Sequence, residues 1–137
     1  MGLILDTSIL IAGERRGHSV EDILQQASAT FGEFDLAISA ISAIELAHGI
    51  YRAKSISDRE RRRLFCQDAF HDLIVHPVSL PIAELAGRIE GEQAAIGNSI
   101  AIEDLIIGAT ALHFGFDVVT LNVKHFRLIP GLKTVTL

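Results

Sequence analysis

Short apolar segments with strand character alternate along this chain with longer segments of helical pattern. No internal repeat or low-complexity segment interrupts the alternation. Strands separated by helices are joined by crossover connections, which produce a mainly parallel sheet with helices on both faces. The pattern therefore predicts an α/β fold, with a mainly parallel central sheet flanked by helices in an α/β/α sandwich. The 137 residues fit a single domain, residues 1–137, and require no linker.

The predicted elements follow from apolar spacing and from residues that begin or end helices. We predict strands over residues 2–5, 36–38, 74–78, 117–121 and 133–136, and helices over residues 7–14, 20–30, 42–54, 57–72, 80–96 and 101–114. Ser19 is a candidate cap for the second helix. The third and fourth helices begin with capping-box patterns, Ser42 to Glu45 and Ser57 to Glu60. Gly115 ends the last predicted helix, and residues 124–128 are predicted to form a loop or short turn.

Apolar residues make up 49% of the chain and the mean hydropathy is positive, which is high for a soluble chain. This content indicates a fully covered sheet and a further apolar surface for a partner, either a second copy in a homodimer or a small protein. The longest apolar runs, residues 3–13 and 100–114, contain acids and are too short to span a bilayer, so we expect no membrane segment. The N-terminus has no basic region or small-residue cleavage site, and Cys66 is the single cysteine. Both features favour the cytoplasm.

The charge is unevenly distributed. A net charge of −5 argues against binding nucleic acid by bulk attraction alone. Six of the twelve basic side chains nevertheless fall within residues 52–63: Arg52, Lys54, Arg59, Arg61, Arg62 and Arg63. Two interpretations stay open, a phosphate-binding patch or a solvated helix face on which Asp58 and Glu60 are the partners.

Three acids occupy apolar surroundings far apart in the sequence. Asp6 follows the first strand, whereas Glu45 and Asp104 lie near the starts of predicted helices. Ligands bind beyond the carboxyl ends of parallel strands, where these groups and Asn122 can converge. Crowded carboxylates repel one another by about 4 kcal/mol at about 4 Å unless a cation or proton is present. Oxygen ligands suit Mg²⁺ or Mn²⁺, while the histidines and Cys66 lack the paired spacing of a zinc site.

Each candidate also has a purely structural interpretation. Asp6 can cap the helix that starts at Thr7, and Glu45 can complete a capping box with Ser42. Asp104 has the weakest structural alternative, because apolar residues cover nearly every direction of its helix and an unpaired buried acid is unfavourable.

Glu103 and three histidines are further polar residues that the sequence allows us to interpret. Glu103 projects about 100° around the helix from Asp104, so it is either an acid that supports the ligand set or a surface residue, and we favour the surface. His48, His113 and His125 have no partner that the sequence identifies, and we treat them as ordinary polar residues.

Four ordered segments carry a family resemblance: residues 3–11, 38–49, 103–111 and 119–126. Together they resemble the PIN domain over essentially the whole chain, and most closely the VapC toxins of bacterial toxin–antitoxin pairs. The resemblance implies a Mg²⁺- or Mn²⁺-dependent endoribonuclease, with an RNA substrate and a small inhibitory antitoxin as partner.

The resemblance also implies roles for individual residues. Asp6 and Asp104 match direct metal ligands, and Glu45 matches a ligand or a base that positions water. Asn122 falls where many members carry a fourth acid, so the catalytic set is Asp6, Glu45, Asp104 and Asn122. An amide is neutral, which leaves the number of metal ions open, and His125 stands where an acid often precedes Phe126. The hydroxyls of Thr7, Ser8 and Thr120 would orient substrate or water.

Other functions compete with this one. A catalytically weak or inactive PIN scaffold that binds protein or RNA is the main alternative, because Asn122 is neutral. A dehalogenase-like phosphatase needs a second acid two residues after the first, where Ser8 stands. A response-regulator receiver needs paired acids after the first strand and a lysine at a late strand end, but the only candidate, Lys124, lies beyond Asn122.

Overall fold

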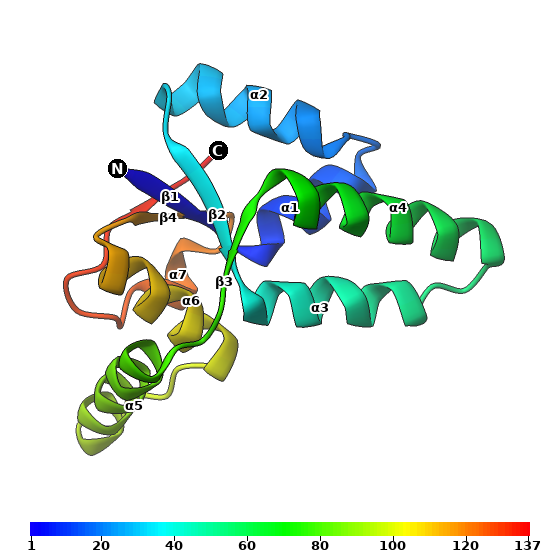
Figure 1. Ribbon diagram of the computed structural model, residues 1–137. Coiled ribbons are helices and arrows are strands. Elements are labelled where there is room, and N and C mark those ends of the chain that lie inside the picture. The colour runs from blue at the N-terminus through cyan, green and yellow to red at the C-terminus, as the bar shows by residue number, and fades with distance from the viewer.

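A five-stranded, fully parallel sheet forms the centre of the molecule. The computed structural model describes residues 1–137. The strands are β1 (Gly2–Leu5), β2 (Asp35–Ser39), β3 (Ile74–His76), β4 (Asp117–Val119) and β5 (Thr134–Val135). Their order across the sheet is β3-β2-β1-β4-β5, and every neighbouring pair is parallel (Figure 1). The predicted fold class is therefore confirmed.

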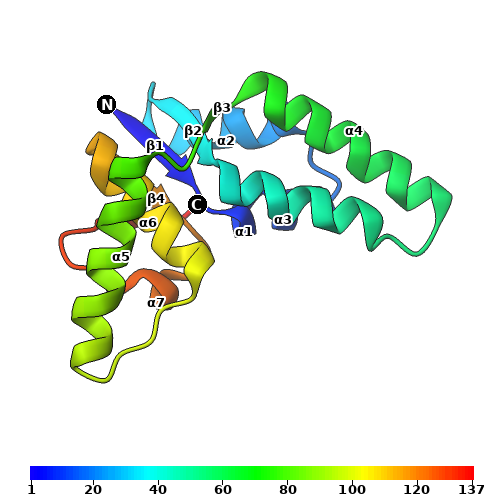
Figure 2. The same ribbon diagram turned by 60° about the horizontal axis from the view of Figure 1, so that its bottom comes forward.

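Seven helices connect and cover the strands. They are α1 (Thr7–Arg15), α2 (Val20–Phe31), α3 (Ala40–Tyr51), α4 (Ile56–Asp72), α5 (Leu80–Ala95), α6 (Ile102–Phe114) and the short α7 (Val123–Phe126). None of them combines the length and apolar composition that crossing a bilayer requires. Helices α3 and α4 run side by side away from the sheet, while α5 extends in another direction (Figures 1 and 2).

The sheet separates two apolar cores because side chains alternate between its faces. Leu3 and Leu5 of β1 point into a core shared with α1, α2, α3 and α4. Ile4, between them, points into a second core with α5, α6 and α7. The entire β1 strand is buried, which explains why it is a continuous apolar run rather than an alternating one.

The starts of two helices differ from the prediction. Helix α3 begins at Ala40 with Ser39 as its cap, so Ser42 is a buried residue inside the helix and forms no capping box with Glu45. Helix α4 begins at Ile56, and the hydroxyl of Ser55, rather than that of Ser57, accepts a hydrogen bond from the Asp58 N–H. Each segment contains two serines, and either one is a good helix cap, so local sequence does not indicate which serine begins the helix.

Other boundaries agree closely with the predictions. The first strand is confirmed at residues 2–5, and Ser19 caps α2 in a complete capping box with Asp22. Gly115 ends α6 in the left-handed conformation, with a φ of 69° that favours glycine. Residues 124–128, predicted as a loop or short turn, instead include most of α7.

The strand order creates a switch point between β1 and β4. From β1 the chain passes through α1 and α2 to β2 on one side, whereas β4 lies on the other side of β1. The connections on the two sides leave in opposite directions, which opens a crevice at the carboxyl ends of these strands. Asp6 immediately follows β1, and the segment Thr120 to Asn122 follows β4.

Candidate active site

An open cleft of about 520 Å³ lies at the carboxyl ends of β1 and β4. Helices α1, α3 and α6 and the segment around α7 contribute its walls. All four predicted catalytic residues line it. The polar side chains of the cleft that matter for its chemistry are Asp6, Glu45, Glu103, Asp104, Asn122 and His125.

Asp6 is held in place by two hydroxyl groups. It occupies the N-cap position of α1, yet its side chain makes no capping hydrogen bond. Its Oδ2 instead accepts hydrogen bonds from Ser8 Oγ and Thr120 Oγ1, each at 2.7 Å. The residue is only 6% exposed, while Oδ1 receives no protein hydrogen bond and is not sealed from solvent. One carboxylate oxygen is thus fixed by the protein and the other remains available to a ligand.

Glu45 reaches the cleft from the second turn of α3. The hydroxyl of Thr7 lies 2.8 Å from Glu45 Oε1 and also 2.8 Å from Ser42 Oγ. Burial raises the pKa of the Glu45 carboxyl, the Thr7 hydrogen bond opposes that rise, and the negative charges of Asp6 and the α6 acids add to it. The capping role considered for Glu45 is therefore wrong, and its carboxylate faces other acids.

Asp104 lies in the first turn of α6, with a side chain that is 15% exposed. Burial raises its pKa to about 6; the nearby His125 opposes the rise, while Asp6 and Glu103 reinforce it. His125 Nδ1 is 3.5 Å from Asp104 Oδ2. A carboxylate with a pKa raised in this way binds a proton or a cation more readily than an ordinary surface acid.

The acids of the cleft repel one another, but they do not form a preformed metal-binding cluster. The charges of Asp6 and Glu103 raise the pKa of both Glu45 and Asp104. No three acidic, histidine or cysteine side chains enclose a common point closely enough to hold an ion on their own. Mg²⁺ usually keeps several waters and takes only one or two carboxylates together with substrate phosphate oxygens. The donor set consequently fits an open, water-filled Mg²⁺ or Mn²⁺ site better than a preformed structural one.

Asn122 stands on the rim of the cleft at the start of α7. Its side chain makes no capping hydrogen bond, and its backbone N–H donates to Thr120 Oγ1 at 2.8 Å. Thr120 therefore links Asp6 to the Asn122 backbone through one buried hydroxyl. The amide of Asn122 remains exposed at the edge of the cleft, where it adds no negative charge.

Sequence reasoning missed three residues of the cleft. Glu103 was expected on the surface, but the structure places it, partly exposed, on the cleft wall. His125 was given no partner and approaches Asp104. Arg15, at the end of α1, also lines the cleft and was not singled out. Local sequence offers little indication of these three positions because each depends on how two elements pack. His48 and His113 are exposed and do not line the cleft, as expected.

Comparisons with known proteins agree with the family resemblance of the sequence. A family model described as PIN domain matches residues 3–131. A protein named Ribonuclease VapC from Rickettsia bellii is 32% identical over 99% of this chain and 96% of its own length. Among solved structures, VapBC2 from Rickettsia felis, bound to a DNA fragment from the promoter, superposes with a TM-score of 0.85 at 23% identity, covering 100% of this chain and 99% of that chain. A DNA-bound VapBC from Salmonella typhimurium gives 0.83 at 25% identity, covering 99% and 98%.

Proposed function

The chain belongs to the PIN domain family, and on that premise we propose that it is a divalent-metal-dependent endoribonuclease that acts as the toxin of a toxin–antitoxin pair. One observation carries the proposal. The carboxylates of Asp6 after β1, Glu45 of α3 and Asp104 of α6 line one cleft, and the pKa values of Glu45 and Asp104 are raised by burial and by repulsion from neighbouring acids. Such a cluster is unfavourable unless it binds a proton or a cation, and a divalent cation beside an open cleft supplies the charge that assists phosphodiester hydrolysis.

The proposed ligands are Asp6 and Asp104, with Glu45 as a further ligand or as the group that positions water. Mg²⁺ or Mn²⁺, when bound, supplies positive charge that stabilises the reacting phosphate and lowers the pKa of a bound water. Asp6 presents one oxygen because Ser8 and Thr120 hold the other. Glu45, with its raised pKa, is suited to accept a proton from the attacking water.

The remaining groups of the cleft bind and orient. Asn122 offers an N–H donor to a phosphate oxygen without repelling it, since an amide carries no charge. Thr7 fixes the rotamer of Glu45 through the 2.8 Å contact. No residue of the cleft needs to form a covalent intermediate, because a water molecule in line with the leaving 3′-oxygen completes the hydrolysis.

The proposed partners are RNA, a small antitoxin and a second copy of the chain. Support for the antitoxin comes from the fold, which is shared with chains of VapBC structures. Large apolar side chains such as Ile44, Leu80 and Ile102 are more than half exposed and offer a surface for either protein partner. We propose that the protein acts in the cytoplasm, where it would encounter both RNA and its antitoxin.

A metal-dependent cleavage assay tests the proposed function. The purified chain should cut single-stranded or looped RNA in Mg²⁺ or Mn²⁺ and lose activity in EDTA. Asp104→Asn should abolish cleavage while the far-UV circular dichroism spectrum stays nearly unchanged. Asp68→Asn, which changes an exposed acid of α4 outside the cleft, is the matched control and should retain activity. Cleavage by Asp104→Asn at the wild-type rate would refute the assignment.

The neutral side chain of Asn122 favours one second candidate, a catalytically inactive PIN scaffold that binds RNA or protein. The same assay separates the two functions. An inactive scaffold binds RNA without cutting it at any Mg²⁺ or Mn²⁺ concentration, whereas the proposed nuclease produces fragments whose yield follows metal occupancy.

A further inference from the structure

A second hollow adjoins the acidic cleft. It has a volume of about 100 Å³ and lies between α1, α3 and α4. Ile11, Arg15 and Glu45 line both hollows, so the two adjoin at Arg15. The second hollow contains another cation, Arg62, which reaches in from α4. A nucleic-acid backbone that enters the acidic cleft can therefore continue past Arg15 and Arg62.

Arg15 has no partner of its own. It is exposed and forms no ion pair with any acid of the protein. The acid next to it in sequence, Glu14, is already engaged by Arg61 at 3.1 Å. The guanidinium of Arg15 thus keeps its N–H donors free at the junction of the two hollows.

Arg62 differs from the arginines on either side of it. Arg61 pairs with Asp58 at 2.8 Å and Arg63 pairs with Glu60 at 2.7 Å, both on the surface. Arg62 instead donates one hydrogen bond, from Nη1 to the Gly49 carbonyl at 2.7 Å, and has no acidic partner. The Gly49 contact fixes the position of its side chain, and its other N–H groups remain available.

The positive charges of Arg15 and Arg62 can offset the repulsion between the acidic cleft and phosphate groups. The acids that hold a cation also repel the phosphates on either side of the scissile one, and the chain as a whole carries a net charge of −5. An arginine binds phosphate with two parallel hydrogen bonds, which gives both charge and geometry. We propose that Arg15 and Arg62 form a phosphate-binding subsite that holds the RNA backbone beside the scissile phosphodiester.

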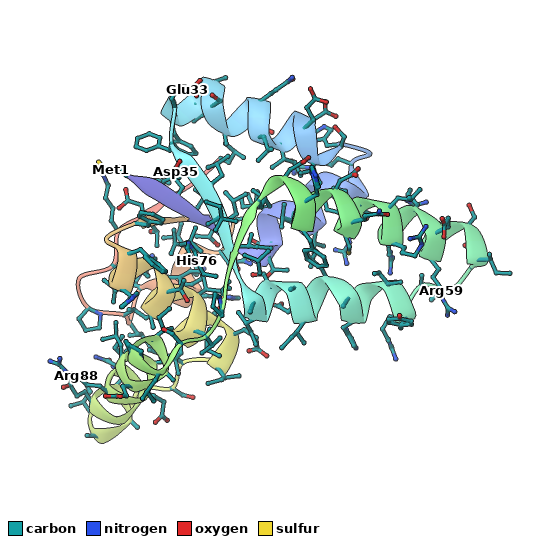
Figure 3. All side chains as sticks on the ribbon, in the orientation of Figure 1. Met1, Glu33, Asp35, Arg59, His76 and Arg88 are labelled. Atoms are coloured by element: carbon teal, nitrogen blue, oxygen red, sulfur yellow. The ribbon has the colours of Figure 1, made fainter.

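The position of the subsite sets the path of the strand. It directs RNA out of the cleft along the α3–α4 pair, away from the acidic wall formed by Glu103. Arg59 lies at the far end of that pair, near the loop that joins α3 to α4 (Figure 3). Arg59 also forms no ion pair with an acid, so basic groups continue in the same direction. This subsite rests on the proposed ribonuclease function.

Two adjacent arginines provide a matched test. Arg15→Gln and Arg16→Gln remove the same charge one residue apart, but Arg16 lines a different hollow, away from the acids. Arg15→Gln should raise KM for a short single-stranded RNA about tenfold, the loss expected for hydrogen bonds to a charged group, with kcat within about twofold. Arg16→Gln should leave both constants within about twofold, and Arg15→Lys should recover part of the loss because it restores charge without the paired donors.

A binding measurement makes the test independent of catalysis. Affinity of the wild-type chain for the same RNA is measured in EDTA by fluorescence anisotropy at several salt concentrations. Loss of one phosphate contact in Arg15→Gln should reduce the slope of log affinity against log salt by about 0.7. Unchanged KM and an unchanged slope in Arg15→Gln would overturn the subsite. If the wild-type chain cleaves no RNA, the proposed function fails, and this slope still decides the role of Arg15.

A double-mutant cycle tests whether the two arginines share one phosphate. The Arg15→Gln/Arg62→Gln variant should lose less affinity than the product of the two single fold-changes, because both side chains contact the same group. Arg62→Gln also loses the Gly49 hydrogen bond, so each variant is first shown by thermal unfolding to be folded at the assay temperature. Fold-changes that multiply without coupling would overturn a shared subsite.

Discussion

Replacing Asp104 with Asn should make the metal-free protein more stable as well as inactive. The native carboxyl has a pKa of about 6, raised chiefly by burial, against 3.8 for an ordinary aspartate. Each pKa unit corresponds to about 1.4 kcal/mol, so carrying the charge at neutral pH destabilises the fold by up to about 3 kcal/mol. Asn has nearly the same shape without the charge. It also loses the 3.5 Å contact with His125, which is more than half exposed and contributes little.

The pH dependence of this gain has a definite sign. Between pH 3.8 and about 6 the native carboxyl of Asp104 keeps its proton while the unfolded chain has lost it. The native state then binds more protons, so wild-type stability falls as pH rises through that range and the full penalty is present above it. The advantage of Asp104→Asn should be about 3 kcal/mol at pH 7.5 and shrink to about 1 kcal/mol at pH 4.5.

Urea unfolding in EDTA at the two pH values measures the gain. The free energy of unfolding is obtained by linear extrapolation for the wild type, for Asp104→Asn and for the exposed control Asp68→Asn. The control should show no comparable gain at pH 7.5. If Asp104→Asn is less stable than the wild type at pH 7.5, or if its gain does not change with pH, the reasoning from burial and repulsion is wrong.

Three further predictions concern the metal, the hydroxyl that holds Asp6, and two glycines. Mg²⁺ or Mn²⁺ should raise the thermal unfolding midpoint of the wild type in a concentration-dependent way, and Asp6→Asn should remove most of that rise. Thr120→Val deletes a buried hydroxyl that donates to Asp6 at 2.7 Å, so urea unfolding should show a loss of about 1–3 kcal/mol and the RNA assay a lower rate. Gly2→Ala would place Cβ about 2.6 Å from the Phe116 ring and should destabilise by about 1–3 kcal/mol. A Cβ at Gly87 of helix α5 would meet open space, so Gly87→Ala should instead stabilise the fold by up to about 1 kcal/mol in the same experiment. Stability changes of the same sign for the two variants would contradict the close contact of Gly2 with Phe116.

The layers of the fold and the place of the principal acids could be predicted from sequence. An uninterrupted apolar run such as residues 2–5 is characteristic of a strand buried on both faces, and the residue after it lies at the carboxyl edge of the sheet, where the crevice forms. The position of Asp104 in the cleft could be predicted because an acid on a helix that is apolar on nearly every side has few structural uses. These inferences depend on local pattern and on general rules for parallel sheets.

The remaining features of the site depend on how separate elements pack. The start of α3 at Ala40 was missed because Ser39 and Ser42 are equally good local caps. In the fold, Ser39 accepts the capping hydrogen bond from the Ile41 N–H, whereas Ser42 lies inside the helix and contacts the Thr7 hydroxyl. The approach of His125 to Asp104 requires the turn of α7, which four residues cannot signal by periodicity. Arg15 lines the cleft because of how α1 is rotated about its own axis. The sequence of α1 alone does not determine that rotation.

The central claim is that Asp6, Glu45 and Asp104 together bind one divalent cation. Crystals of the full chain soaked in Mn²⁺ and measured at the manganese absorption edge test it directly, because anomalous scattering locates the ion without reference to the protein density. We predict an anomalous peak in the cleft within coordinating distance of Asp6 and Asp104 oxygens, with Glu45 coordinated or linked by one water. Absence of a peak there at saturating Mn²⁺, or a peak bound only by other residues, would contradict the claim.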